Sequence, residues 1–561
     1  MTKYIVVAGG VISGVGKGVT TAALGKIIKE NGYKTTLIKI DPYINCDAGT
    51  LRPTEHGEVW VTDDGGEIDQ DLGTYERFLD QSIPKKNNIT TGQIYKAVID
   101  RERAGGYLGQ TVQFVPHITN EVISRIKDAA DGYDVAVIEI GGTVGDFENK
   151  PFFFAVKALE RELGSDNVAY VLVCYLPVPA HIHEMKTKPA LQAIRLLNEE
   201  GISPDFIVCR SQYAIDEIRK NKIETYAHIP SDHVIAAPDI DTIYQIPLDL
   251  ERERVGAKML KKLNLVSKRT PDWSAWQLRV DAIKNPAKRV RIGIVGKYLS
   301  TGDYSLTDSY LSIDQALIHA GAQLNVGIDV VWLDAQSVCI PHVTELQSDS
   351  SSAKSELQSL DGIIVPGGFG VAGVEGKIAV IQYAREHNIP YLGLCYGMQL
   401  AAVEFARNVC GLRDAHTTEV NAQTEHPIID ILPLQKKLID DNAYGGTMRL
   451  GAYAAHVQPG SKVAALYRAA RAIDMNDMVI ERHRHRYEMN PAYVALLEQH
   501  GLRFSGRYLR ADATQLMEFL ELPDHPFFVA TQAHPEFNSR FSNPNPLFYG
   551  FVKAAIVSKQ E

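Results

Sequence analysis

The stretch YIVVAGGVISGVGKG, residues 4–18, decides the fold of the first half of the chain. Tyr4–Ala8 is a short apolar run of the kind found in strands that are covered on both faces. A glycine-rich loop follows, and apolar residues then recur at near-helical spacing from Ala22 to Ile28, with Gly32 placed to end that helix. A strand, a loop and a helix in this order predict the first unit of an α/β fold with a parallel sheet.

The glycine-rich loop has the composition of a phosphate-binding site. Successive glycine N–H groups, a helix N-terminus and the ammonium group of Lys17 all attract anionic oxygens. The loop is P-loop-like but not a strict P-loop, because five residues rather than four separate Gly10 from Gly16 and because Gly18 stands where Ser or Thr should follow the lysine. Since a glycine-rich loop alone is a weak signal, the prediction depends on its place between a strand and a helix.

Outward from this unit, strand and helix patterns alternate to about residue 265. Five more Val- and Ile-rich runs predict strands of the same sheet: Thr35–Ile40, Val135–Ile140, Val168–Tyr175, Phe206–Cys209 and Val234–Ala237. Residues 266–289 break the rhythm with Thr270-Pro271 and Asn285-Pro286. We therefore predict a linker there, with a short helix around Trp276–Ile283.

Residues 290–561 form a second predicted α/β domain. Its strand candidates are Arg291–Val295, Gly362–Val365, Pro390–Leu394 and Phe527–Thr531. The Ser-rich window Ser348–Ser359 is predicted to be an exposed loop. A domain at 1–265, a linker at 266–289 and a domain at 290–561 agree with the length of 561 residues, which exceeds what one hydrophobic core usually organises.

The composition excludes several classes of protein. A net charge of −10 argues against a nucleic acid or an anionic membrane bound by bulk electrostatics. Six cysteines without a CxxC pair are too few for a disulfide scaffold and favour a reducing compartment. The N-terminal residues run directly into the first strand, and no apolar run of 18 residues occurs, so we expect a cytoplasmic protein without a membrane partner.

The strongest catalytic signal lies in the second domain. Gly393-Leu394-Cys395-Tyr396-Gly397 connects a predicted strand to a helix predicted over Met398–Arg407. A G-x-C-x-G string at such a turn is the cysteine counterpart of a nucleophile elbow, in which the glycines permit a sharp turn and a close approach of substrate. The helix N-terminus favours a thiolate on Cys395 and supplies N–H groups to an oxyanion.

A base for Cys395 must come from elsewhere in the sequence. Thr531-Gln532-Ala533-His534-Pro535-Glu536 follows the last strong strand, where His534 can accept the thiol proton and Glu536 can orient the imidazole. We predict a Cys-His-Glu triad in that chain order. The alternative, a buried structural cysteine and an unrelated surface histidine, is disfavoured by the combination of the elbow glycines with the strand-end His-Pro-Glu.

These motifs resemble the class I glutamine amidotransferases over most of residues 290–561. The resemblance implies that Cys395 forms a glutamyl thioester and that ammonia is released. It also implies that Pro366-Gly367-Gly368-Phe369-Gly370 is the oxyanion strand of that family, with the Gly368 N–H stabilising the tetrahedral intermediate. A plain tight turn is the alternative for this string.

Carboxylates that hold Mg²⁺ are expected beside a phosphate loop. Glu139 ends a buried-strand pattern just before Gly141-Gly142, and buried acids are otherwise rare. Asp71, in Asp69-Gln70-Asp71-Leu72-Gly73, is a second candidate, although spacing alone would equally suit an aspartate that caps a turn.

Longer strings resemble the CTP synthase family, in the family's order and over nearly the whole chain. They are VVAGGVIS (6–13) with GKG (16–18), KIDPYIN (39–45), HGEV (56–59), EIGGTVGD (139–146), KTKP (186–189), GGTMRLG (445–451) and ERHRHRYE (481–488). The resemblance implies that the 4-oxygen of UTP is phosphorylated by Mg-ATP and that ammonia from glutamine then displaces the phosphate. Because a carbonyl oxygen is a poor leaving group and a phosphate a good one, a phosphate loop fused to a glutaminase suits this chemistry.

The resemblance also assigns site residues. It gives ATP to Gly14, Val15, Gly16, Lys17, Gly18, Val19, Lys39, Asp71, Pro238, Asp239 and Ile240, and Mg²⁺ to Asp71 and Glu139. It assigns the binding of UTP, and of CTP as feedback inhibitor, to Ser13, Asp146, Phe147, Glu148, Lys186, Thr187, Lys188, Pro189 and Lys222. It gives glutamine to Gly368, Tyr396, Gly397, Met398, Gln399, Glu419 and Arg486, and an ammonia channel to Pro53, His56 and Val59. Without the family, a solvated surface charge would be the simpler interpretation of each lysine.

Two departures from the family pattern affect these assignments. Ala190-Leu191 follows Pro189 where the family usually has Thr-Gln, which weakens the assignment of Lys186 and Lys188 to uridine. Ala372 stands where the family usually has an arginine associated with activation by GTP. Allosteric activation by GTP is therefore in doubt for this sequence, whereas the catalytic residues are not.

Alternatives to this interpretation remain. His483-x-His485 has the spacing of a metal pair but no obvious thiolate or carboxylate partner. The second candidate function is that of another glutamine-dependent amidoligase, which amidates a carboxylate through an acyl phosphate. A non-catalytic scaffold is a third possibility, because the family is tetrameric and assembles filaments. A homotetramer is expected from the resemblance.

Overall fold

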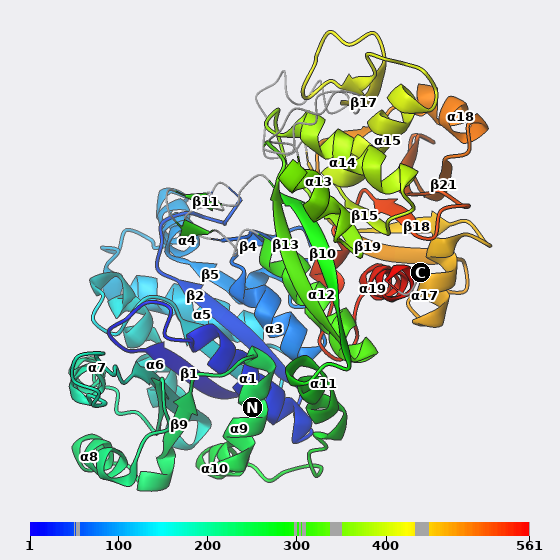
Figure 1. Ribbon diagram of the computed structural model, residues 1–561. Helices are drawn as coiled ribbons and strands as arrows, with labels where there is room; N and C mark the ends of the chain where they lie inside the picture. The colour runs from blue at the N-terminus through cyan, green and yellow to red at the C-terminus, as the bar shows by residue number, and fades with distance from the viewer. Residues whose placement is uncertain are drawn as a thin grey trace. The chain divides into compact units, whose positions relative to one another are not determined.

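The computed structural model describes residues 1–49, 51, 57–296, 300–301, 304–305, 310–336, 351–431 and 448–559. The chain folds as two compact units (Figure 1). Unit 1 comprises Met1–Thr50 and Glu67–Val280, and unit 2 comprises Leu51–Gly66 and Asp281–Glu561. None of the described helices combines the length and the hydropathy that crossing a bilayer requires.

Unit 1 is built on a seven-stranded sheet in the order β5-β2-β6-β1-β7-β8-β9, in which all neighbours are parallel. Its strands are β1 (Lys3–Gly9), β2 (Thr35–Asp41), β5 (Asn88–Thr90), β6 (Val135–Ile140), β7 (Val168–Tyr175), β8 (Phe206–Ser211) and β9 (Val234–Pro238), with a separate short β4 (Glu67–Ile68). Its helices are α1 (Lys17–Glu30), α3 (Asp71–Leu79), α4 (Thr91–Arg103), α5 (Thr119–Ala130), α6 (Lys150–Leu163), α7 (Lys188–Glu199), α8 (Glu217–Ala227), α9 (Ile246–Arg252) and α10 (Val255–Lys262).

The side chains of β1 explain why this sheet is covered on both faces. Tyr4, Val6 and Ala8 join a core cluster with residues of α4 to α8, whereas Ile5 and Val7 are equally buried but lie outside that cluster. Since successive strand residues point to opposite faces, both faces of the sheet are packed. The six strands predicted in this half are all present, so the prediction of a parallel-sheet α/β fold is confirmed.

Unit 2 is built on a nine-stranded mixed sheet in the order β13-β10-β14-β15-β23-β22-β21-β18-β19. Its strands are β10 (Lys288–Gly296), β13 (Val326–Asp334), β14 (Gly362–Val365), β15 (Tyr391–Leu394), β18 (Arg449–Val457), β19 (Met478–His485), β21 (Arg503–Leu509), β22 (Gln515–Glu521) and β23 (Phe528–Thr531). Smaller strands are β3 (Trp60–Val61), β11 (Ser300–Thr301), β12 (Tyr304–Ser305), β16 (His416–Thr417), β17 (Pro427–Ile431) and β20 (Tyr487–Met489). Its helices are α12 (Leu311–Leu324), α13 (Ser351–Gln358), α14 (Val374–Glu386), α15 (Tyr396–Asn408), α17 (Lys462–Ala469), α18 (Pro491–Gln499) and α19 (Pro546–Ser558).

Two core clusters lie on the two faces of this sheet. One gathers residues of α14 and α15, and the other gathers residues of α12, α17 and α19. From β13 to β23 neighbouring strands are parallel, and from β23 to β19 they are antiparallel. The predicted strands of this half and the helix after Cys395 are present, which confirms a second α/β domain.

One prediction in this half is wrong. The Ser-rich window was predicted to be an exposed loop, but Ser351–Gln358 forms the helix α13, while Ser348 to Ser350 lie outside the described residues. Leu357 is buried and belongs to the core cluster of α14 and α15. A tertiary contact at one apolar residue thus outweighs the local preference that the serines express.

The predicted linker begins as part of unit 1. The helix α11 (Ser274–Lys284) confirms the short helix predicted around Trp276. Trp276 is buried, donates from Nε1 to the Tyr244 carbonyl at 2.7 Å and packs on the ring of Phe78. The boundary between the units falls within α11, at Val280.

A segment from the first half of the sequence belongs to unit 2. Within residues 57–66, the ring of Trp60 is buried 5.0 Å from that of Phe537, and the Asp63 carbonyl accepts a hydrogen bond from the Ala452 N–H at 2.9 Å. No local pattern predicted that this segment belongs to unit 2, because its contacts join residues that lie hundreds of positions apart.

Candidate active sites

The phosphate loop of unit 1 has the backbone that its glycines predict. Gly14 and Gly16 have φ of +70° and +92°, in the left-handed region that favours glycine, and α1 begins directly afterwards at Lys17. Lys17 is nearly buried and donates from Nζ to the Gly142 carbonyl at 2.8 Å. Burial lowers the pKa of Lys17, although the carboxylate of Glu139 opposes the shift. The loop therefore holds one cation and a helix N-terminus together, as anion binding requires.

The departure at Gly18 has a structural reason. A β-carbon built on Gly18 would lie 2.5 Å from Oδ1 of Asp71, so a Ser or Thr side chain cannot occupy this position unless Asp71 moves. The predicted metal carboxylate thus lies against the first turn of α1, in the place where a strict P-loop carries a hydroxyl group.

The two predicted Mg²⁺ ligands converge on a single cation. Lys39, at the end of β2, donates to a carboxylate oxygen of Asp71 and, at 2.9 Å, to Oε1 of Glu139. Burial lowers the pKa of Lys39, but the carboxylates of Asp71 and Glu139 outweigh it and raise that pKa well above its usual value. Burial raises the pKa of Glu139, which is almost inaccessible to solvent. The structure brings Lys17, Lys39, Asp71 and Glu139 into one site, as predicted.

Three polar residues of this site were missed by the sequence analysis. The Tyr75 hydroxyl of α3 donates to Oε2 of Glu139. Asp41 accepts a hydrogen bond from Asn88 at 2.8 Å and lies 3.9 Å from Nζ of Lys39. Burial raises the pKa of Asp69 well above its usual value, and the neighbouring carboxylate of Asp41 adds to this shift. The acidic string around Asp69 and the spacing of Asp41, two residues after Lys39 on one strand, could have drawn attention to two of them.

The donor set of this site fits a hard divalent cation. Mg²⁺ prefers carboxylate oxygens and is usually bound by one or two of them together with substrate phosphates. Asp71 and Glu139 each place a carboxylate oxygen against the Lys39 ammonium, and the loop at Gly14–Gly16 supplies the phosphate cradle. The residues present therefore suit Mg²⁺ with a nucleotide.

The residues assigned to UTP and CTP come from the turn after β6, from the segment that leads into α7 and from α8 of unit 1. Oδ2 of Asp146 accepts the Thr143 N–H, which orders the turn after β6, and Phe147 is 80% exposed beside it. Lys186 is paired with Glu184, and Thr187 is buried just before α7. Lys222 lines an open pocket of about 620 Å³ with Leu191, Ile218, Asn221, Thr225, Tyr226 and His228. The departure at Leu191 thus lies in the same pocket as an assigned lysine.

The end of β9 approaches the phosphate loop through an arginine. Arg210, on β8, donates to Oδ1 of Asp239 at 3.2 Å, and its Nε lies 3.6 Å from the position of a β-carbon on Gly16. Pro238 ends β9, so Asp239 and Ile240 follow the carboxyl end of that strand, where parallel sheets bind ligands. Arg210 was not predicted.

The triad of unit 2 is assembled as predicted. Cys395 stands between β15 and α15 with φ of 51°, a strained value for a residue with a side chain. Nδ1 of His534 donates to Oε1 of Glu536 at 2.7 Å. Burial lowers the pKa of His534, but Glu536 and the hydrogen-bonded Cys395 thiol outweigh it and raise that pKa to about 10. The imidazole is therefore protonated at neutral pH.

The glycines of the second site keep space for these groups. A β-carbon on Gly397 would lie 2.1 Å from the Val365 carbonyl, and one on Gly367 would lie 2.8 Å from Cε1 of His534. The string that starts at Pro366 therefore passes directly against the His534 imidazole. The predicted role of this string as an oxyanion strand stays a prediction.

The residues assigned to glutamine surround the same turn. Oε1 of Glu419 accepts the Gly370 N–H at 2.7 Å, and the Tyr396 hydroxyl donates to the Gly370 carbonyl at 3.3 Å. Gln399 donates to Oε1 of Gln532 at 3.2 Å, and Gln532 in turn donates to the Cys395 sulfur at 3.6 Å. Gln532 was missed, although it lies in the string that contains His534. Met398 is buried on α15 and Arg486 follows β19.

Of the predicted channel residues, only Val59 is described. It is buried in the segment 57–66 of unit 2. Pro53 and His56 lie outside the described residues, so their predicted role remains a prediction.

His483 and His485 belong to a buried charged network. Their ring nitrogens lie 3.0 Å apart, and Glu518 and Glu488 lie 3.5 Å and 3.6 Å from them, respectively. Burial lowers the pKa of both histidines well below the usual value, and the charge of Arg449 adds to this shift. Within the described part of the chain, this pair is not among the groups whose ligand atoms converge as a metal site needs.

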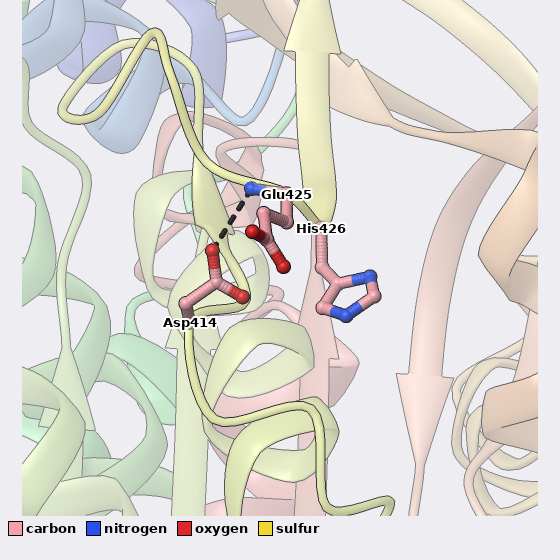
Figure 2. Close-up of side chains that lie close together, drawn as sticks. All are labelled: Asp414, Glu425 and His426. Atoms are coloured by element: carbon pink, nitrogen blue, oxygen red, sulfur yellow. Dashed lines mark hydrogen bonds between the residues drawn. The ribbon is translucent and has the colours of Figure 1, made fainter.

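The group that does converge lies on the surface of unit 2. Asp414, Glu425 and His426 place ligand atoms within 4.8 Å of one another, and the Glu425 N–H donates to Asp414 (Figure 2). Both carboxylates are exposed, and surface acidic groups are common without a bound ion.

Comparisons with known proteins agree with this geometry. Residues 3–265 match a family model described as the CTP synthase N-terminus, and residues 305–554 match one for class I glutamine amidotransferases. The chain is 49% identical to a CTP synthase of Methanopyrus kandleri, with 99% of each chain covered. It is also 49% identical to a CTP synthase of Pyrococcus abyssi, which covers 100% of this chain and 99% of the relative.

A solved structure is similar to part of the chain. It is a Trypanosoma brucei CTPS glutaminase domain with bound acivicin, 36% identical, which covers 48% of this chain and 94% of its own, with a TM-score of 0.41. The family models and the full-length relatives cover both catalytic halves of the chain. The chain therefore belongs to the CTP synthase family, the ligases that convert UTP to CTP in a glutamine-dependent reaction.

Proposed function

We propose that the two sites act in sequence on one pyrimidine nucleotide. Unit 1 transfers the γ-phosphoryl group of ATP to the 4-oxygen of UTP, and ammonia released in unit 2 attacks C4 and expels phosphate, which leaves CTP. The observation that carries the proposal is the presence in one chain of an assembled Cys395-His534-Glu536 triad and of the Lys17, Lys39, Asp71 and Glu139 site.

In the glutaminase reaction, the Cys395 thiolate attacks the side-chain carbonyl carbon of glutamine. The Gly368 N–H stabilises the oxyanion, and the His534 imidazolium donates its proton to the departing ammonia. Water, deprotonated by His534, then attacks the glutamyl thioester and releases glutamate, which restores the Cys395 thiolate and the His534 imidazolium. Glu536 holds the imidazole by its hydrogen bond to Nδ1 throughout.

In the synthetase reaction, Lys17 and the loop at Gly14–Val19 bind the ATP phosphates and neutralise the charge that moves. Asp71 and Glu139 are the proposed Mg²⁺ ligands, and the ion supplies neutralisation of the phosphate oxygens. CTP synthases use ATP and Mg²⁺ generally. Lys39 donates to both carboxylates and so sets their spacing. Pro238, Asp239 and Ile240 contact the adenine.

The remaining assignments complete the proposal. UTP binds at Ser13, Asp146–Glu148, Lys186–Pro189 and Lys222, and CTP competes there as a feedback inhibitor. Glutamine binds at Gly368, Tyr396–Gln399, Glu419 and Arg486. Its ammonia travels along Pro53, His56 and Val59.

The chain is proposed to act as a homotetramer in the cytoplasm. Leu108, Phe114, Val115 and Phe154 of unit 1 expose large apolar side chains, which monomeric soluble proteins rarely gather at one surface. Phe154 and Val115 line one open pocket of about 600 Å³, so at least these two are neighbours. The five described cysteines are free thiols, in keeping with a reducing compartment. Filaments of tetramers are a further proposal from the family.

GTP is the least supported effector. Ala372 is exposed just before α14, and no basic group stands at this position to attract a nucleotide. We propose that glutamine-dependent synthesis is little stimulated by GTP.

The test is an assay with UTP, ATP, Mg²⁺ and glutamine, with and without GTP. Formation of CTP supports the proposal, and its absence under all conditions contradicts it. A carboxylated acceptor tested in parallel examines the amidoligase alternative, which the match of residues 3–265 to the CTP synthase N-terminus disfavours.

A further inference from the structure

Two aromatic rings connect the segment 57–66 to the catalytic base of the glutaminase. The Phe537 ring stacks on the His534 imidazole, with centroids 5.3 Å apart and planes 20° apart. The Trp60 ring packs on Phe537 at 5.0 Å and 60°. Because Trp60 is only 1% exposed, its volume is part of the packing that fixes Phe537 and, through it, the plane of the imidazole.

Arg482 makes a second connection between the same two places. The backbone carbonyl of Arg482 accepts a hydrogen bond from the backbone N–H of His534 at 2.7 Å. The side-chain Nε of Arg482 donates to Oδ1 of Asp63 at 2.6 Å. Its guanidinium carbon lies 5.4 Å from the centroid of the Trp60 ring. Arg482 is completely buried, so its charge depends on hydrogen-bonded partners such as Asp63.

The segment itself is held firmly in unit 2. The Ser312 N–H donates to Oε2 of Glu58 at 2.9 Å, and the Ala452 N–H donates to the Asp63 carbonyl at 2.9 Å. Gly451 has φ of +99°, and a β-carbon there would lie 2.8 Å from the Asp63 carbonyl oxygen. Because this backbone packs so closely, it can hold the residues that it contacts in a fixed position.

We propose that Trp60 and Asp63 are positioning residues for His534, acting through Phe537 and Arg482. They lie in the part of the sequence that matches the CTP synthase N-terminus, yet they fix the imidazole of the amidotransferase triad. The amidotransferase sequence 305–554 therefore lacks two of the groups that orient its own base. This inference rests on the proposed glutaminase function of Cys395 and His534.

The test compares Trp60→Ala, Trp60→Phe and Asp63→Ala in the full chain, with Asp64→Ala as matched control. Asp64 is the next residue, also exposed, and bonds within its own turn to Thr62. Glutamine hydrolysis is measured as kcat and KM across pH, and ammonia-dependent CTP formation is measured on the same preparations. A tilted imidazole should lower the glutaminase kcat about tenfold in Trp60→Ala and Asp63→Ala.

The same variants should leave the KM for glutamine within about twofold, because ground-state binding is untouched. The alkaline limb of their pH profile of glutamine hydrolysis should move to lower pH, because a displaced His534 imidazole is less well paired with Glu536. Trp60→Phe, which keeps an aromatic ring on Phe537, should recover most of the rate, and Asp64→Ala should match the wild type.

Equal glutaminase rates and pH profiles for Asp63→Ala, Trp60→Ala and Asp64→Ala would overturn the inference. A loss of thermal stability without any change in kcat or pH profile would also overturn it, because it would show a structural role alone. Wild-type chain that hydrolysed no glutamine would instead contradict the proposed function.

Discussion

The carboxylate of Asp71 occupies the space that a side chain on Gly18 would need, since a β-carbon there would lie 2.5 Å from Oδ1 of Asp71. Gly18→Ala should therefore turn Asp71 away from Lys39 and lower ammonia-dependent CTP formation about ten- to a hundredfold, the usual cost of displacing a metal-site group. Glutamine hydrolysis should continue. Gly201→Ala, in open space at a φ of +75°, is the control: it should cost some stability but leave turnover intact. Full synthetase activity in Gly18→Ala would contradict this assignment of Asp71.

Cys395 can be separated from the synthetase by a single substitution. Cys395→Ala removes the nucleophile at the start of α15 but leaves unit 1 unchanged. Glutamine-dependent CTP formation should become undetectable, while synthesis with added ammonia should keep its wild-type rate. Rates with each nitrogen donor, measured on one preparation, check this prediction. A folded variant that lost both activities would rule out two independent sites.

The triad predicts a specific pH dependence. Because the pKa of His534 is raised from 6.5 to about 10, the stability from its pairing is complete below pH 6.5 and is lost as pH rises through about 10. The proton that His534 gives to ammonia is lost over the same range, so glutaminase activity should fall there. Glu536→Gln removes a main cause of the raised pKa, so the alkaline limb should move to lower pH. A limb that stayed in place would show that Glu536 does not hold the imidazolium.

Tyr75 should matter for metal binding, although it bears no charge at neutral pH. Its hydroxyl donates to Oε2 of Glu139, a proposed Mg²⁺ ligand. Removal of a group that hydrogen-bonds to a metal ligand typically weakens metal affinity ten- to a hundredfold. Tyr75→Phe should therefore raise the Mg²⁺ concentration for half-maximal ammonia-dependent synthesis about tenfold, with a smaller change in the rate at saturating Mg²⁺.

Tyr170→Phe provides the matched control for Tyr75→Phe. It removes a hydroxyl that bonds to the Val156 carbonyl and Glu160 in the same unit, away from the proposed metal ligands. Its Mg²⁺ dependence should equal that of the wild type. Coinciding Mg²⁺ titrations for the two variants would contradict a role of Tyr75 in orienting Glu139.

The sequence by itself determined the two catalytic strings and their local conformation. The turn at Cys395 and the loop at Gly14–Gly16 depend on glycine, on a preceding strand and on a following helix, all of which are read within about twenty residues. The periodicity of apolar runs likewise predicted the parallel sheet of unit 1, because a strand covered on both faces must be apolar throughout.

Only the tertiary structure decided which distant groups meet these strings. Tyr75 joins the Lys39 site, and Trp60 and Asp63 reach His534 across more than four hundred residues of sequence. No periodicity or local motif encodes such contacts, because they depend on how elements pack rather than on what each element is. The same reason made Ser351–Gln358 a helix, since the burial of Leu357 is a property of the folded unit and not of the Ser-rich window.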